Sequence, residues 1–179
     1  MVYVLLGTGF EEMEAITPID LLRRAGIGVI TVGLNGQTVF GGHNIGIQAD
    51  ITIDQLDLAK MEMIVLPGGL GGVASIKNCP KAMAALEYAR KNDKWIAAIC
   101  AAPTILAQEH ITDHIRAVCY PGCEEQMGMA QITSDACVRH GKVITGTSAG
   151  CAIPFALELI RALKGEEVAQ QVKEQIVIR

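Results

Sequence analysis

The sequence is poor in aromatic residues, which make up 4% of its 179 residues, whereas 50% are hydrophobic. Its apolar residues are therefore mostly aliphatic, and the chain is long enough to bury a sizeable core in one domain. Basic residues are also few, since 15 Lys and Arg stand against 19 Asp and Glu and form no block. This charge balance excludes the basic surface that nucleic-acid binding requires.

Long apolar runs are missing as well. The longest uncharged apolar run, residues 95–107, falls short of the roughly 20 residues that span a bilayer. The N-terminus carries no basic segment of the kind that opens a secretory signal. We therefore expect a cytoplasmic protein that makes no membrane contact.

The six cysteines include no Cys-x-x-Cys pair. In a cytoplasmic chain of this length, reduced thiols are expected rather than disulfides. Cys119 and Cys123 are spaced Cys-x-x-x-Cys, but no pair of histidines lies nearby, which disfavours a zinc site. No Gly-Lys-Ser/Thr phosphate loop occurs either, so we expect neither a metal nor a cofactor.

Short apolar runs alternate with helical spacing along the whole chain. Strands are predicted at residues 2–6, 28–34, 61–69, 95–99, 115–120, 131–138 and 142–147. Helices are predicted at 14–26, 80–92, from 103 onward, at 151–165 and at 166–175, and the glycine-rich segment 35–47 is predicted to be a hairpin or a loop.

Near-continuous Val/Ile strands that alternate with helices indicate a mostly parallel sheet with helices on both faces. We therefore predict one doubly wound α/β domain over residues 1–179. In such folds ligands bind outside the carboxyl ends of the strands. The functional residues are expected in segments 7–14, 67–72, 100–103, 120–123 and 146–151.

Residues 7–12, GTGFEE, begin like a dinucleotide-binding fingerprint. Glu12 occupies the third glycine position, and Glu11 and Glu14 add two more carboxylates. Their charge would repel a pyrophosphate, which disfavours NAD binding. We expect Glu11 and Glu12 to be solvated at a helix N-terminus, whereas Glu14 opens the amphipathic run and can point inward.

Residues 146–150, GTSAG, match the Gly-x-Ser-x-Gly elbow of serine hydrolases. All four histidines precede Ser148 and no Asp follows it, so the rest of a hydrolase triad is missing in the required order. The segment is better explained as a turn in which Ser148 caps a helix.

Cys100 lies at the predicted turn from strand 95–99 into a helix. A thiol at a helix N-terminus faces free N–H groups and the positive end of the dipole, which favour the thiolate. The N–H groups of Ala101, Gly68 and Gly69 could then bind an oxyanion. Cysteine in an apolar run is also a common core residue, and spacing alone leaves the two interpretations equal.

Three segments together, GFEEMEA (9–15), IVLPGG (64–69) and AAICAAPT (97–104), resemble the ThiJ/PfpI superfamily in order and spacing. The sequence is most similar to the subgroup that contains the parkinsonism-associated protein deglycase and bacterial YajL. The resemblance implies a flavodoxin-like fold and a homodimer. It also implies that Cys100 is the nucleophile at the elbow and that Glu14 is the acid beside it, with Gly68, Gly69 and Ala101 supplying backbone donors.

The implied activity is that of a glyoxalase III or protein deglycase, which acts on 1,2-dicarbonyls such as methylglyoxal and on glycated side chains. An alternative implied by the same cysteine is an oxidative-stress sensor or redox-regulated chaperone. A cysteine peptidase is less well supported, because Ala101 replaces the histidine of that branch. Tyr120 aligns with a histidine near the thiol in the deglycase subgroup, and His43 with an arginine near the dimer interface.

Overall fold

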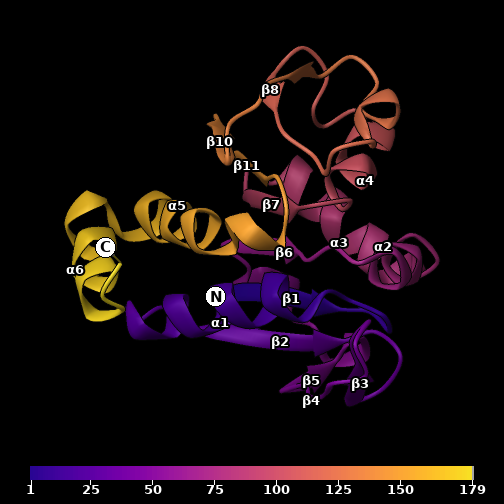
Figure 1. Cartoon of the computed structure of the whole chain (residues 1–179). Helices are drawn as coiled ribbons and strands as arrows, with labels where there is room; N and C mark the ends of the chain where they lie inside the picture. Colours follow the sequence, from indigo (N-terminus) through magenta and orange to yellow (C-terminus); the bar gives the residue numbers. More distant parts are fainter. Residues whose placement is uncertain (179) are drawn as a thin grey trace.

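A seven-stranded sheet runs through the middle of the molecule (Figure 1), in the strand order β10-β11-β7-β6-β1-β2-β5. The computed structural model describes residues 1–178. Neighbouring strands are parallel, except that β10 and β11 are antiparallel. The strands are β1 Val2–Leu6, β2 Val29–Gly33, β5 Ile51–Thr52, β6 Met63–Leu66, β7 Trp95–Ile99, β10 Cys137–His140 and β11 Val143–Gly146.

Helices cover both faces of the sheet, and the side chains of β1 show how the two layers form. Val2, Val4 and Leu6 pack with residues of α1, α5 and α6, whereas Tyr3 and Leu5 pack with residues of α2, α3 and α4. This alternation is the period of a strand that is buried on both faces. The helices are α1 Glu12–Arg24, α2 Leu70–Lys77, α3 Pro80–Lys91, α4 Pro103–Gln108, α5 Ala152–Lys164 and α6 Glu166–Gln175.

The predicted doubly wound, flavodoxin-like domain is therefore confirmed. The predicted hairpin within 35–47 is also present, as β3 (Thr38–Phe40) paired with β4 (Gly46–Gln48). Short 3-10 turns complete the described elements: η1 Ile53–Gln55, η2 Leu58–Lys60, η3 Glu124–Gln126 and η4 Ala149–Cys151. Within residues 1–178, none of the helices has both the length and the apolar character needed to cross a bilayer.

Two sequence predictions need correction. Segments 115–120 and 131–138 do not extend the main sheet along their length, because β8 (Arg116–Ala117) and β9 (Gln131–Ile132) form a separate two-stranded parallel sheet.

Helix α2 was not predicted from the sequence. Its two consecutive glycines, Gly71 and Gly72, lower helix propensity and hide its apolar spacing.

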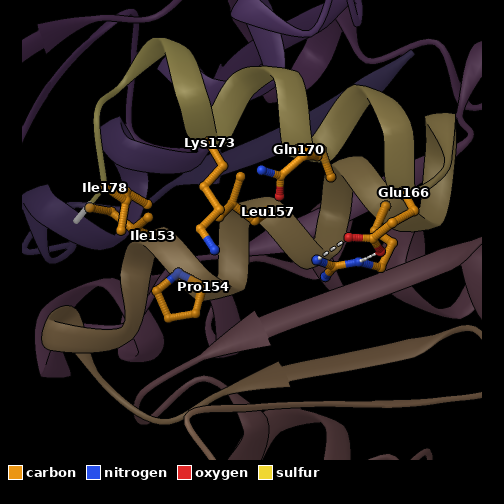
Figure 2. Close-up of a pocket in the computed structure, with 9 residues that line it drawn as sticks. Ile153, Pro154, Leu157, Glu166, Gln170, Lys173 and Ile178 are labelled. Carbon is orange, nitrogen blue, oxygen red and sulfur yellow. Dashed lines mark hydrogen bonds and ion pairs between the residues drawn. The ribbon is translucent and has the colours of Figure 1, made fainter.

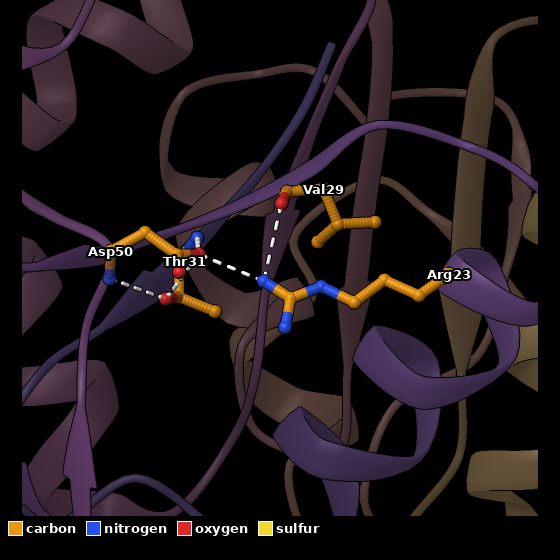
Figure 3. Close-up of polar contacts among 4 residues, drawn as sticks. All are labelled: Arg23, Val29, Thr31 and Asp50. Carbon is orange, nitrogen blue, oxygen red and sulfur yellow. Dashed lines mark hydrogen bonds and ion pairs between the residues drawn. The ribbon is translucent and has the colours of Figure 1, made fainter.

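One edge of the sheet is held by a polar cluster around Asp50, just before β5 (Figure 3). The Asp50 carboxylate accepts hydrogen bonds from Thr31 N at 2.8 Å, Thr31 Oγ1 at 2.9 Å and Arg23 Nη2 at 2.9 Å. Partial burial favours the neutral acid, but the bonds from Thr31 and the charge of Arg23 outweigh it and lower the pKa of Asp50. The cluster joins the end of α1 to β2 and to the residue that precedes the edge strand β5.

Candidate active site

The turn after β7 places Cys100 at the carboxyl end of the sheet in a left-handed conformation, with φ of 67°. Non-glycine residues rarely adopt this conformation, and they do so where surrounding contacts enforce it. Here Cys100 N donates to Gly146 O at 2.9 Å, and Cys100 O accepts from Tyr120 N at 2.7 Å. Both backbone groups of the cysteine are thus fixed by neighbouring segments, and its side chain is half-buried.

Glu14 reaches the same point from the first turn of α1, and its side chain is completely buried. The helix begins there because the Glu11 carboxylate caps it, accepting from Glu14 N at 2.8 Å. Glu14 Oε2 accepts from Gly68 N at 2.9 Å. No donor is in hydrogen-bonding geometry with Glu14 Oε1 in residues 1–178, and the interaction of this carboxyl with the Cys100 thiol makes the thiol the group with which it can exchange a proton.

Gly68 lies between the two side chains. A Cβ at this position would lie 2.7 Å from the Cβ of Cys100 and would overlap the Glu14 carboxylate. A residue without a side chain is therefore required for the thiol and the carboxyl to meet. Because its N–H already bonds to Glu14, we group Gly68 with the acid and not with the oxyanion donors.

The remaining two predicted donors face the sulfur. The N–H groups of Gly69 and Ala101 both interact with Cys100 and lower its pKa. Gly69 has φ of 82° and precedes α2, and its Cα lies so close to the loop after β1 that a Cβ would meet Gly9 O at 2.5 Å. The backbone conformation and this close approach both require glycine.

Burial dominates the electrostatics of the pair. It raises the pKa of Glu14 to about 7, against smaller opposing effects of the Cys100 thiol and the Gly68 N–H. Burial, followed by the charge of Glu14, raises the pKa of the Cys100 thiol to about 12. A stable thiolate, which the helix N-terminus led us to expect, is thus not favoured. The N–H groups of Ala101 and Gly69 lower the pKa of the thiol, but burial outweighs them.

Tyr120 contacts the elbow through its backbone. Its N–H bonds to Cys100 O, whereas its side chain is 48% exposed. The structure therefore gives the Tyr120 phenol no contact that would hold it against the sulfur within residues 1–178. The Ser148 of the GTSAG segment is the N-cap residue of η4, as predicted, but its side chain makes no capping bond.

His43 pairs with Glu12 at the start of α1. Glu12 Oε1 accepts from His43 N at 2.7 Å, and Glu12 Oε2 lies 2.8 Å from His43 Nδ1. The hydrogen bond that the His43 ring donates to the Glu12 carboxylate raises the pKa of His43. The expectation that Glu12 is solvated is wrong, because it is only 6% exposed and is covered by the loop that carries His43.

Ligating atoms of Glu11, Glu12 and His43 lie within 4.8 Å of one another, a spacing that a metal ion could bridge. Their oxygens are already used, however. Both Glu12 oxygens bond to His43, and Glu11 Oε2 accepts from Glu14 N. The trio is therefore best described as a helix cap joined to an ion pair.

A cavity of about 310 Å³ lies elsewhere, between α5 and α6 (Figure 2). Aliphatic side chains such as Ile153, Leu157 and Ile178 line it, and Glu166 pairs with Arg161 at one end. It contains no nucleophile and no buried titratable group that could act with one. The chemistry of this chain is therefore concentrated at Cys100 and Glu14.

Comparison with known proteins places the chain in a family. The model of the DJ-1/PfpI family matches residues 1–162. Protein dj-1beta of Drosophila melanogaster is 35% identical over 178 residues, covering 98% of this chain and 95% of that protein. The crystal structure of Drosophila DJ-1beta, also 35% identical, superposes with a TM-score of 0.94 over 99% of this chain and 97% of that one.

Two further relatives cover most of the chain. The Parkinson disease protein 7 homolog of Danio rerio is 35% identical over 181 residues, covering 98% of this chain and 96% of its own. The glutathione-independent glyoxalase DJR-1.2 of Caenorhabditis elegans is 30% identical over 159 residues, covering 88% and 84%. The resemblance seen in the sequence motifs is confirmed: the chain belongs to the DJ-1/PfpI family.

Proposed function

We propose that the protein is a cofactor-independent glyoxalase that converts a 2-oxoaldehyde such as methylglyoxal to the 2-hydroxy acid, lactate. The observation that carries the proposal is the buried Glu14 carboxyl, with its unpartnered Oε1, beside the Cys100 thiol. A carboxyl whose pKa is near 7 can both accept and donate protons at neutral pH. The name of the Caenorhabditis relative, glutathione-independent glyoxalase, supports the same reaction class.

The first step forms a carbon–sulfur bond. Ionised Glu14 takes the thiol proton as the Cys100 sulfur attacks the aldehyde carbon, so that no stable thiolate is needed. The N–H groups of Gly69 and Ala101 stabilise the oxyanion that develops. Glu14 then returns the proton to this oxygen and a hemithioacetal results.

The second step moves a hydrogen between carbons. Glu14 removes the proton from the former aldehyde carbon, which gives an enediol, and delivers it to the neighbouring carbon to form a thioester. Water then hydrolyses the thioester, which releases lactate and restores the thiol. The first carbon is oxidised and the second reduced, so the reaction needs no external redox partner.

Transfer of the dicarbonyl carbon from an early glycated side chain to Cys100 would make the protein a deglycase: the bond from that carbon to the glycated thiol or amine breaks as its bond to the Cys100 sulfur forms, and the thiol proton passes through Glu14 to the leaving group. Six unpaired cysteines suit a reducing compartment, so the proposal places this activity in the cytoplasm.

The experiment is to measure lactate formed from methylglyoxal by the wild type and by Cys100→Ala, Glu14→Gln and Cys79→Ala. Cys79 is also half-buried and serves as the matched control.

Turnover is expected to vanish in Cys100→Ala, to fall roughly 100-fold or more in Glu14→Gln and to stay unchanged in Cys79→Ala. Full activity of Cys100→Ala would refute the proposal. Loss in the cysteine variant alone would leave Cys100 as nucleophile but remove Glu14 from proton transfer.

Redox sensing is a second candidate, and it rests on the same free oxygen. Two equivalents of peroxide would oxidise the Cys100 thiol to a sulfinate and release water. Protonated Glu14 could then donate from Oε1 to a sulfinate oxygen. Peptide mass spectrometry after mild peroxide treatment tests this: gain of two oxygens at Cys100 before the other five cysteines supports sensing, and uniform oxidation argues against it.

A further inference from the structure

A groove of about 240 Å³ lies between α2 and the cysteine elbow. One wall is formed by Leu70, Val73, Ala74 and Lys77, which follow the i, i+3, i+4, i+7 spacing of a single helix face. The groove therefore runs along α2 from its first residue to its last. Between Leu70 and Lys77 the helix rises about 10 Å.

The opposite wall comes from the elbow and the segment after β8. Ala101, Thr104 and Cys123 line it, and Gln126 adds one exposed polar side chain. The Thr104 hydroxyl donates to Ala101 O at 2.7 Å. This hydroxyl is therefore already hydrogen-bonded within the wall, and the methyl group is the part of the side chain left for apolar contact. This wall is therefore largely apolar.

One end of the groove lies next to the elbow, at residues adjacent in sequence to the reacting cysteine and to a donor glycine. Its lining includes Ala101, whose N–H faces Cys100, and Leu70, which directly follows the second donor, Gly69. A substrate carbonyl held by these two N–H groups would have its remaining carbons beside Leu70. The Leu70 side chain is 84% exposed, and an apolar substituent lying against it would remove this surface from water.

The far end of the groove is positively charged. Lys77, in the last turn of α2, takes part in no ion pair within residues 1–178. A free ammonium at the end of an apolar groove favours an anionic group on the bound molecule. An apolar cavity of roughly 150 Å³ is enough to hold benzene, so the groove has room for an aromatic ring.

Resting on the glyoxalase function proposed above, we infer that this groove is a substrate subsite. It selects 2-oxoaldehydes that carry an apolar substituent the size of a ring, and it favours those that end in a carboxylate near Lys77. Methylglyoxal, whose substituent is a single methyl group, would leave the groove empty.

The test compares kcat/KM for methylglyoxal, phenylglyoxal and 4-carboxyphenylglyoxal. Ala74 is exposed and outside the catalytic machinery, so Ala74→Phe fills the groove while Ala74→Ser keeps it open as the control. Ratios between substrates are compared among variants, which cancels the different intrinsic reactivities of the aldehydes. Ala74→Phe should lower the phenylglyoxal-to-methylglyoxal ratio about tenfold or more, whereas Ala74→Ser should leave this ratio as in the wild type.

Lys77→Gln should lower the ratio of 4-carboxyphenylglyoxal to phenylglyoxal roughly threefold, as expected for a partly exposed ion pair. Unchanged ratios in both Ala74→Phe and Lys77→Gln would overturn the inference while leaving the glyoxalase function intact.

If the wild type turns over no aldehyde, the proposed function fails. The groove is then tested by peptide mass spectrometry of Cys100 alkylation. N-phenylmaleimide should lose its rate advantage over N-methylmaleimide in Ala74→Phe, and an equal advantage in wild type and variant would overturn the inference.

Discussion

At the residue scale, the backbone of Cys100 stores conformational free energy. Its φ of 67° is costly for any residue with a Cβ and nearly free for glycine. We expect Cys100→Gly to be more stable than Cys100→Ala by about 1 kcal/mol, although both lack the thiol. Urea unfolding of the two variants measures the difference. Equal midpoints would mean that the elbow is unstrained.

Glu14 also links stability to pH. Its pKa in the folded chain is about 7, against 4.5 as its ordinary value, so the folded state holds the proton more tightly. The stabilisation is fully present below pH 4.5 and is lost as the pH rises through about 7. Glu14→Gln cannot ionise, so its stability relative to wild type should improve by about 2 kcal/mol between pH 5 and pH 9.

Urea unfolding of both proteins at the two pH values tests this linkage. Asp20→Asn is a suitable control, because Asp20 lies on the same helix but is exposed. A relative stability of Glu14→Gln that does not change with pH would show that the folded chain does not raise the pKa of this carboxyl.

The position of the site could be read from the sequence, but its electrostatics could not. Cys100 and Glu14 follow strand ends that the apolar runs of β7 and β1 mark clearly. The thiol pKa depends instead on how deeply the carboxyl and sulfur are buried together, which is a tertiary property. The role of Gly68 is similar: only the structure shows its N–H directed to Glu14 rather than to the sulfur.

At the scale of elements, predictability followed the strength of the apolar pattern. Strands β1 and β7 are continuous apolar runs, and they occur with the predicted bounds. Helix α2 carries two glycines and was missed, although it begins directly after Gly69 and lines the groove. Segment 115–120 is also mostly apolar, with Arg116 as its one charged residue, yet only two of its residues pair as β8. Local sequence cannot show whether a partner strand is available.

The Asp50 cluster offers a test of how an edge strand is secured. Thr31 is 4% exposed, and its hydroxyl both donates to Asp50 Oδ2 and accepts from Asp50 N. Thr31→Val keeps the shape and leaves both Asp50 groups without this partner, so it should cost about 1–2 kcal/mol of unfolding free energy.

Thr38→Val is the matched control. The Thr38 hydroxyl also donates a hydrogen bond, to Gln48 Oε1 at 2.9 Å, but on the exposed hairpin. Its loss should change stability by no more than about 0.5 kcal/mol, since water replaces the bond. Equal effects of the two substitutions in urea unfolding would contradict a stabilising role for the Asp50 cluster.

At the scale of the whole molecule, α1 and α5 pack against each other (Figure 1), and both carry aliphatic side chains that are exposed. Met13 and Ile16 of α1, Ile45 of the hairpin loop and Ile153 of α5 each expose at least 40% of their surface. Surface of this kind is costly in water unless a partner covers it. We propose that a second copy of the chain does so, in line with the homodimer implied by the family resemblance.

Charge at this surface should separate the copies. Ile16→Glu places a carboxylate in the proposed interface, and a symmetric interface would bring it close to its own copy. We expect a monomer in sedimentation velocity for Ile16→Glu and a dimer for the wild type. Leu70→Glu is the control, because Leu70 is even more exposed but lies at the α2 groove, so this variant should stay dimeric. A monomeric wild type, or dissociation of both variants alike, would argue against this interface.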